Sequence, residues 1–193
     1  MRARVRLLGH PVHQMLVVFP LGLLATAVVF DLIHLATGSQ VMAAVSYWMI
    51  AAGLVGGLLA APFGLIDWLA IPAGTRAKRI GAMHGGGNVV VLLLFALSFM
   101  LRDRNYAPEL GESIWAFAGA AVALVTAWLG GELVDRLGVG VDDGAHLDAP
   151  SSLTSQSATG GASRSGTGSA WSGRERRHFP QPAYAGVDRR RHA

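Results

Sequence analysis

Long apolar runs and short polar breaks alternate through the first two-thirds of the chain. The apolar runs cover about residues 15–35, 41–69, 82–101 and 114–133. A helix needs about 20 apolar residues to cross the hydrocarbon core of a bilayer, and each run reaches that length. The pattern therefore predicts an all-α fold, a four-helix transmembrane bundle with short loops.

A basic arm and a polar tail flank the predicted bundle. Residues 1–12 form the arm, and the four-span domain extends over residues 13–141. The first run continues past Ala25-Thr26-Ala27, which resembles a signal cleavage site, so we expect an uncleaved first span. Residues 142–193 are rich in Ser and Gly and then in Arg, and they cannot bury enough apolar surface to fold. They are expected to be a disordered C-terminal tail.

Two of the runs contain a proline, Pro20 in the first and Pro62 in the second. A proline inside a transmembrane helix leaves one carbonyl group free, and neighbouring helices can satisfy it. Each proline therefore predicts a kink or bend rather than a helix end.

Composition and charge agree with a membrane location. The chain is 52% hydrophobic and 15% charged, with a mean hydropathy of +0.42, whereas soluble domains contain about 25% charged residues. Four spans place both termini on one side, and most cations near the membrane lie on that side: Arg2, Arg4, Arg6, Arg76, Lys78, Arg79 and Arg136. The positive-inside rule then predicts a bacterial inner membrane protein with both termini in the cytoplasm.

The basic charge and the missing cysteines narrow the possible partners and cofactors. Arginines at helix ends and in the tail explain the isoelectric point near 10.3, so no nucleic-acid partner is expected. The chain has no cysteine, which excludes disulfides, thiolate metal sites, iron–sulfur clusters and covalently attached c-type haem. The expected partner is the lipid bilayer.

Ionisable side chains from all four spans are predicted to meet at the cytoplasmic face. His10 and His13 begin the first span, Asp67 ends the second and His84 starts the third. Glu132 and Asp135 end the fourth span there, where a solvated helix end would also explain them. His10 as an interfacial residue, and Asp67 in an ion pair with Arg76 or Lys78, are the structural alternatives. Asp31 and His34 share a helix face at the opposite side, near the loop that contains Arg102 and Glu109.

Three glycines, Gly85–Gly87, follow His84 and precede Asn88. Glycines disfavour the helix, so we expect these three to have a structural role that offsets this cost. Close helix packing through the Gly81-xxx-Gly85 and Gly53-xxx-Gly57 patterns is one explanation. Room for a flat cofactor beside His84 is the other.

Several motifs in order resemble the DUF2231 family of bacterial four-helix membrane proteins. They are GHPVHQMLVVFPLGL with Asp31, Gly64-Leu-Ile-Asp67-Trp68, His84-xxx-Asn88, and GGELVDRLGVGV. The resemblance covers about Gly9 to Val141 and implies a fold and a location but no reaction. Family members often have Tyr-Arg-His where this chain has Asp135-Arg136-Leu137. Some related domains occur beside cytochrome-type modules, which hints at redox membranes.

Three functions are compatible with these residues. The first is a small non-enzymatic membrane scaffold or subunit, and no common catalytic motif argues for an enzyme. The second is a b-type haem redox module, with His84 and either His10 or His13 as ligands. The third is a divalent-metal or proton site made by His10, His13, Asp67 and His84. A homo-oligomer or a redox partner would fit any of them.

The C-terminal tail allows two interpretations. Arg174–His178 and Asp188–His192 form a loose basic repeat, which is either a solvated tail or a segment that binds anionic lipid headgroups.

Overall fold

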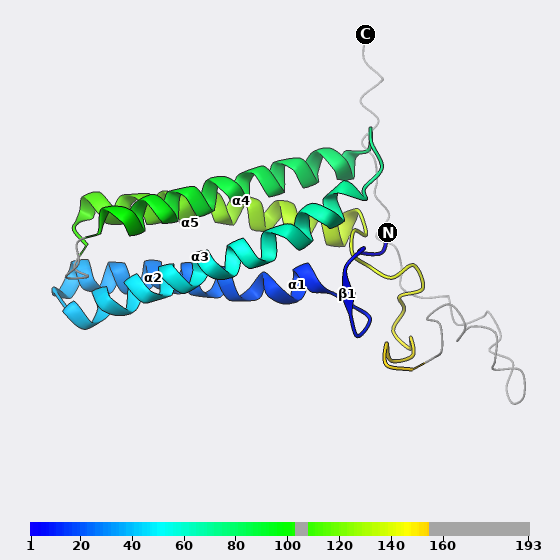
Figure 1. Cartoon of the computed structure of the whole chain (residues 1–193), viewed down its shortest axis with the longest axis horizontal. Coiled ribbons are helices and arrows are strands. Elements are labelled where there is room, and N and C mark those ends of the chain that lie inside the picture. The colour runs from blue at the N-terminus through cyan, green and yellow to red at the C-terminus, as the bar shows by residue number, and fades with distance from the viewer. Residues whose placement is uncertain (103–107, 155–193) are drawn as a thin grey trace, which may run out of the picture.

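The computed structural model of the chain, which describes residues 1–102 and 108–154, is dominated by helices (Figure 1). The helices are α1 (Val12–Leu16), α2 (Val18–Thr37), α3 (Gln40–Leu69), α4 (Arg76–Leu101), α5 (Leu110–Gly131) and a π-helical turn η1 (Glu132–Arg136). Two short strands, β1 (Arg6–Leu7) and β2 (His10–Pro11), pair in the N-terminal arm. Four stretches are long and apolar enough to cross a membrane: Val12–Thr37, Gln40–Leu69, Arg76–Leu101 and Leu110–Arg136. The predicted four-helix transmembrane bundle is confirmed.

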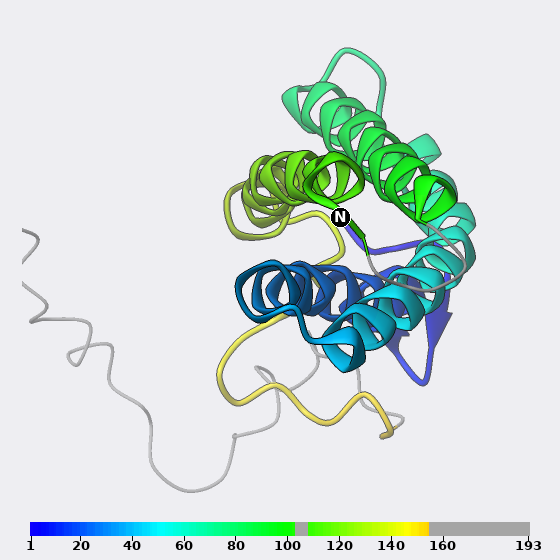
Figure 2. The ribbon, with the colours of Figure 1, turned by 90° about the vertical axis from the view of Figure 1, so that its left-hand side faces the viewer.

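The bundle consists of two antiparallel helical hairpins. Viewed along the bundle, α2 lies beside α3 and α4 beside α5, and the hairpins face each other with α3 next to α4 and α2 next to α5 (Figure 2). We call the end with residues 1–11, 70–75 and 137–154 the terminal end. The other end, with Gly38–Ser39 and Pro108–Glu109, is the turn end. There Gly38 closes α2 in the left-handed conformation, at φ 69°, which glycine adopts without strain.

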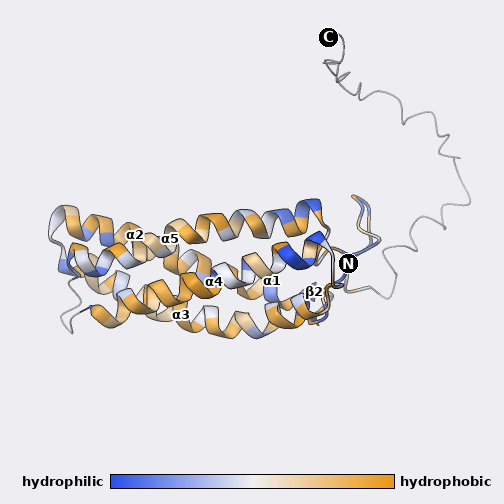
Figure 3. Ribbon diagram, turned by 90° about the horizontal axis from the view of Figure 1, so that it is seen from above, coloured by the Kyte–Doolittle hydropathy of each residue, from blue (hydrophilic) through white to orange (hydrophobic). Residues whose placement is uncertain are grey.

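The core is a narrow apolar seam, while most large apolar side chains point outward. Six buried residues form the core cluster: Leu24, Ala27, Ile50, Val91, Phe95 and Ala116. In contrast, Leu58, Leu93 and Leu124 are 66%, 64% and 75% exposed. Figure 3 shows apolar residues along the whole length of the helices and polar ones mainly near their ends. An apolar exterior of this extent is stable only against lipid, so these faces contact the bilayer.

The two prolines affect their helices differently. The helix is interrupted at Val17, three residues before Pro20, because Pro20 has no N–H for the Leu16 carbonyl and its ring crowds that turn. α1 and α2 together still form one candidate membrane span, so Pro20 interrupts the helix without ending the span. α3 passes Pro62 without interruption.

α4 begins at Arg76, six residues before the apolar run that was predicted from about residue 82. The Thr75 side chain caps this helix by accepting a hydrogen bond from the Lys78 N–H at 3.1 Å. Trp68 fixes the corner before it: its indole N–H donates to the Lys78 carbonyl at 3.0 Å, and the Lys78 ammonium lies 4.0 Å from the ring centre. Gly81 leaves room for the indole. The basic segment is therefore helical from its first cation.

Candidate functional site

His84 of α4 lies against α5 with both ring nitrogens hydrogen-bonded. Its Nδ1 is 2.8 Å from the Thr126 carbonyl oxygen, which can only accept, so Nδ1 carries the proton. Nε2 is then an acceptor and receives the Asn88 side-chain N–H at 3.1 Å. A Cβ at Gly130 would lie 3.1 Å from the ring, so this glycine gives the imidazole its place.

His13 of α1 lies against α3 in the same way. Its Nδ1 is 3.1 Å from the Ala60 carbonyl oxygen, so Nδ1 carries the proton here as well. A Cβ at Gly64 would lie 2.7 Å from the ring, so any residue larger than glycine at this position would displace the imidazole. His13 and His84 both lie near the terminal end, at the start of the first membrane span and of α4. Two of the three predicted cofactor ligands, His13 and His84, are therefore held in the same way, each against the second helix of its own hairpin.

The other two predicted site residues, His10 and Asp67, have different partners. His10 lies in β2, exposed, with Nε2 3.2 Å from the Ser152 hydroxyl. An Asp67 oxygen accepts the backbone N–H groups of Arg4 and Val5, at 2.6 and 3.4 Å. The alternative ion pair of Asp67 with Arg76 or Lys78 is not the arrangement found. Across residues 1–102 and 108–154, no three or more His, Cys, Asp or Glu side chains are grouped so as to hold a metal ion.

Arg76 instead reaches the end of α5. Its guanidinium is 2.5 Å from a Glu132 carboxylate oxygen, and its side chain is 52% exposed. This pair joins the start of α4 to η1. Glu132 is thus partnered rather than simply solvated.

The glycines differ in how closely neighbouring side chains approach them. Gly53 and Gly57 admit leucine side chains from α2 and α4, where a Cβ would lie 2.6 Å from each. Gly87 similarly admits the Thr126 methyl group. Gly85 and Gly86 are exposed and a Cβ on either would meet nothing within 4 Å. Close packing thus explains Gly53-xxx-Gly57, but neither Gly85 nor Gly86.

The N-terminal arm closes the terminal end of the bundle. The Met1 ammonium donates to the Gly138 carbonyl at 3.0 Å, and the Gly140 N–H donates to the Met1 carbonyl at 2.9 Å. Arg2 and Arg6 both contact the Asp142 carboxylate, at 2.5 and 3.3 Å. Residues 142–154 of the predicted tail therefore lie against the arm. The rest of that tail, with its two Arg-rich motifs, lies outside the described residues.

Asp142 carries the charge that this contact depends on. Partial desolvation would raise its pKa, but hydrogen bonds from Arg2, the Gly144 N–H and Arg6 outweigh it, and the pKa lies below the usual value. The carboxylate is therefore ionised through the neutral range.

The turn end holds a buried ion pair that was not predicted from the sequence. Arg102 is bidentate to Asp31, with distances of 2.8 and 2.5 Å, and both side chains are 0% exposed. Arg102 also donates to the hydroxyls of Ser46 and Ser98, at 3.3 and 3.2 Å. Ser98 in turn donates to the Glu112 carbonyl at 2.7 Å. The network therefore joins α2, α3, α4 and α5.

Two further atoms of this region lack a partner among the described residues. They are Arg102 Nε and the hydroxyl of Ser113, both buried. Asp31 was expected to act with His34, but the His34 Nδ1 bonds to the Ser39 carbonyl at 2.9 Å. The available signal in the sequence was a carboxylate, Asp31, near the end of the first apolar run and a guanidinium, Arg102, directly after the third run.

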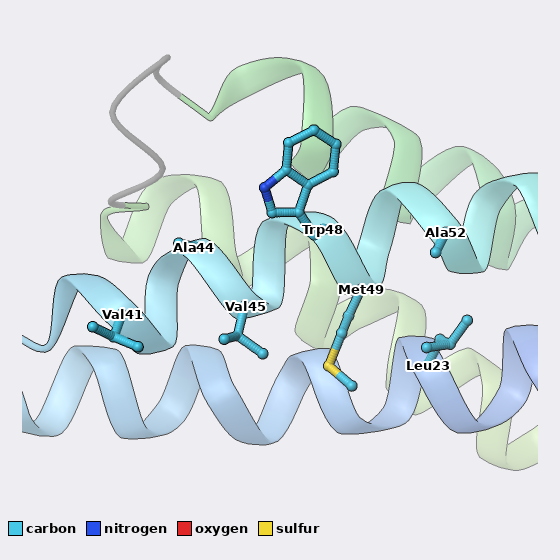
Figure 4. A pocket seen from close by; sticks show the side chains of 7 residues that line it. All are labelled: Leu23, Val41, Ala44, Val45, Trp48, Met49 and Ala52. Atoms are coloured by element: carbon cyan, nitrogen blue, oxygen red, sulfur yellow. The ribbon is translucent and has the colours of Figure 1, made fainter.

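A groove on the outside of the bundle offers no polar chemistry. It runs between α2 and α3 and is lined by Leu23, Val41, Ala44, Val45, Trp48, Met49 and Ala52. Figure 4 shows Val45 and Met49 pointing toward α2. The groove is open, and no charged side chain lines it, so it belongs to the lipid-facing surface.

One comparison with known proteins gave a match. A family model described as a predicted membrane protein, DUF2231, matches residues 9–143. Neither a curated protein nor a solved structure matches the chain.

Proposed function

The chain belongs to the DUF2231 family of predicted membrane proteins, and from this premise we propose that it is a small non-enzymatic scaffold or subunit of a bacterial inner membrane. Its polar groups join four apolar helices at both ends of the bundle. At the terminal end they are His13, His84, Asp67 and the arm. At the turn end they are Asp31, Arg102 and the serines.

The observation that carries this proposal is the Asp31–Arg102 pair. Lipid is as apolar as the helices, so burial of apolar surface provides little driving force for transmembrane helices to associate. A buried charge pair favours association, because separating the helices would leave an unpaired charge in hydrocarbon. The pair contacts elements of both hairpins, which makes it a lock between them.

The positive charges support the proposed orientation. Arg76, Lys78, Arg79 and Arg136 lie at the terminal end, beside the arginines of the arm. Arg102 at the turn end is neutralised by Asp31 inside the bundle. The positive-inside rule therefore favours a cytoplasmic terminal end. Anionic lipid headgroups are then the proposed binding partner of the Arg-rich tail.

Cysteine labelling tests the orientation without interference, because the chain has no cysteine of its own. Gln40→Cys reports on the turn end and Ser152→Cys on the terminal end. In intact spheroplasts, a membrane-impermeant maleimide should label Gln40→Cys and spare Ser152→Cys until the cells are lysed. The reverse pattern would refute a cytoplasmic terminal end.

The stability of Asp31→Asn in detergent tests the lock itself. Loss of one charge from a buried pair should lower the free energy of unfolding by about 3–5 kcal/mol. Asp67→Asn is the matched control, since its amide oxygen still accepts the backbone N–H groups of the arm. Equal and small losses in both variants would remove the basis of the proposal.

A further inference from the structure

The first helices of the two hairpins carry the same pattern of buried and polar positions. The pattern begins with a histidine, His13 in the first hairpin and His84 in the second. A buried charged residue follows 18 residues later, Asp31 after His13 and Arg102 after His84. Between these positions, a shift of 71 residues superposes the buried residues of α2 on those of α4: Pro20 on Val91, Leu24 on Phe95 and Ala27 on Ser98. One helix is thus the structural counterpart of the other.

The second helices repeat as well, with a shift of 66 residues. Gly53 admits the Leu24 side chain, and its counterpart Gly119 admits Phe95, the counterpart of Leu24. The histidine contacts correspond too. His13 bonds to the carbonyl of residue 60 and packs on the glycine four residues later, and His84 does the same with residues 126 and 130. The chain is an internally duplicated pair of hairpins.

The counterparts Asp31 and Arg102 contact each other directly. Two equivalent positions that touch must lie beside the axis that relates them. Both hairpins start at the terminal end, so this pseudo-twofold axis runs along the bundle. His13 and His84 occupy the same helix face as the buried Pro20 and Val91, which follow them after seven residues. They flank the axis at its other end.

We propose that His13 and His84 form one metal-binding site on this axis, with one imidazole from each hairpin. Both rings donate Nδ1–H to a backbone carbonyl, which fixes the tautomer and leaves the Nε2 lone pair for a ligand. Such a carbonyl partner is the usual support of a metal-ligating histidine. The two duplicated hairpins would then bind one ligand together, which is a function in addition to the proposed scaffold role.

The two histidines would hold a metal centre for which two imidazole nitrogens suffice as protein ligands. Haem iron and Cu(I) both meet this condition. His10 and Asp67 are outside this set, because Ser152 and the arm occupy them. Asn88 holds the His84 Nε2 and would turn away when metal binds.

Titration of the purified full-length protein in detergent tests the site with two probes, haemin and Cu(I) held by a competing chelator. We expect one equivalent of one probe per chain, and a low-spin bis-imidazole spectrum if the probe is haemin. Since loss of even a supporting partner weakens metal sites by about 10–100-fold, His13→Gln and His84→Gln should each weaken binding at least tenfold. The glutamine amide can still donate to the Ala60 or Thr126 carbonyl, which keeps the packing.

His10→Gln and Asn88→Ala are the controls. His10→Gln should bind as the unaltered protein does. Asn88→Ala frees the His84 Nε2 and should bind as tightly or more tightly, although it removes a hydrogen bond from the fold. Binding of neither probe would overturn the proposal, as would equal binding by the His13→Gln and His84→Gln variants or an equal loss in His10→Gln.

Discussion

Asp31 of α2 and Arg102 at the end of α4 are joined by two hydrogen bonds in the interior of the bundle, and neither side chain reaches the surface. Each is also the counterpart of the other in the duplicated hairpins. The pair therefore differs from ordinary interfacial charges, which keep their headgroups hydrated. The pair favours contact between the first and the second hairpin, because two copies of the same hairpin would place like charges next to each other.

Removing one charge should cost much more than removing both. Arg102→Met leaves Asp31 buried without its partner, and we expect a loss of about 3–5 kcal/mol in the free energy of unfolding. The double variant Asp31→Leu/Arg102→Met leaves no buried charge and should recover most of that loss. Equilibrium unfolding in mixed detergent with increasing SDS measures both. Equal losses in the single and double variants would contradict this account.

The surface pair Arg76–Glu132 should contribute little, despite its short distance. The Arg76 side chain is 52% exposed, so solvent screens the attraction. Arg76→Ala is expected to lower the free energy of unfolding by less than about 1 kcal/mol in the same assay. A loss as large as that of Arg102→Met would show that exposure is a poor guide here.

Alanine substitutions at two glycines should separate close packing from open helix surface. At Gly64 a Cβ would lie 2.7 Å from the His13 ring, so Gly64→Ala should displace that imidazole and destabilise the protein. At Gly86 nothing lies within 4 Å, and the gain in helix propensity should stabilise the helix by up to about 1 kcal/mol. Thermal denaturation followed by circular dichroism distinguishes the two. The prediction fails if both variants shift the same way.

The contact between the arm and Asp142 should weaken in acid. The folded pKa of Asp142 is lowered, so its stabilising charge is complete above the unfolded value of 3.8 and is lost as the pH falls through the lower folded value. Between pH 5 and 8 the contact should therefore not vary. Asp142→Asn should release the arm at every pH, which trypsin cleavage after Arg2 or Arg6 would report. Cleavage as slow as in the unaltered protein would show that backbone contacts alone hold the arm.

The architecture could be predicted from the sequence because membrane helices are recognised by the length of their apolar runs. Each apolar run is long enough to span, and polar turns separate them, so the four helices follow without tertiary information. The predicted third run began about six residues after the start of α4, because Arg76, Lys78 and Arg79 interrupt the apolar pattern. Thr75 caps the helix there, a local signal that the charge pattern concealed.

The site was harder to predict, since it depends on contacts between helices. His84 could be singled out as a polar residue inside an apolar run, but its partners Thr126 and Asn88 required the packing of α4 on α5. Asp31 was assigned to His34 because both lie on one helical face. Its true partner is 71 residues away, and only the meeting of the two hairpins brings it close.

An exchange of the two charges tests the central claim most directly. Asp31→Arg alone and Arg102→Asp alone place like charges together at the axis and should prevent stable folding. Because the two positions are equivalent, the double exchange Asp31→Arg/Arg102→Asp should restore the pair and most of the free energy of unfolding, measured by SDS titration in mixed detergent. A double variant as unstable as either single one would contradict a lock between equivalent hairpins.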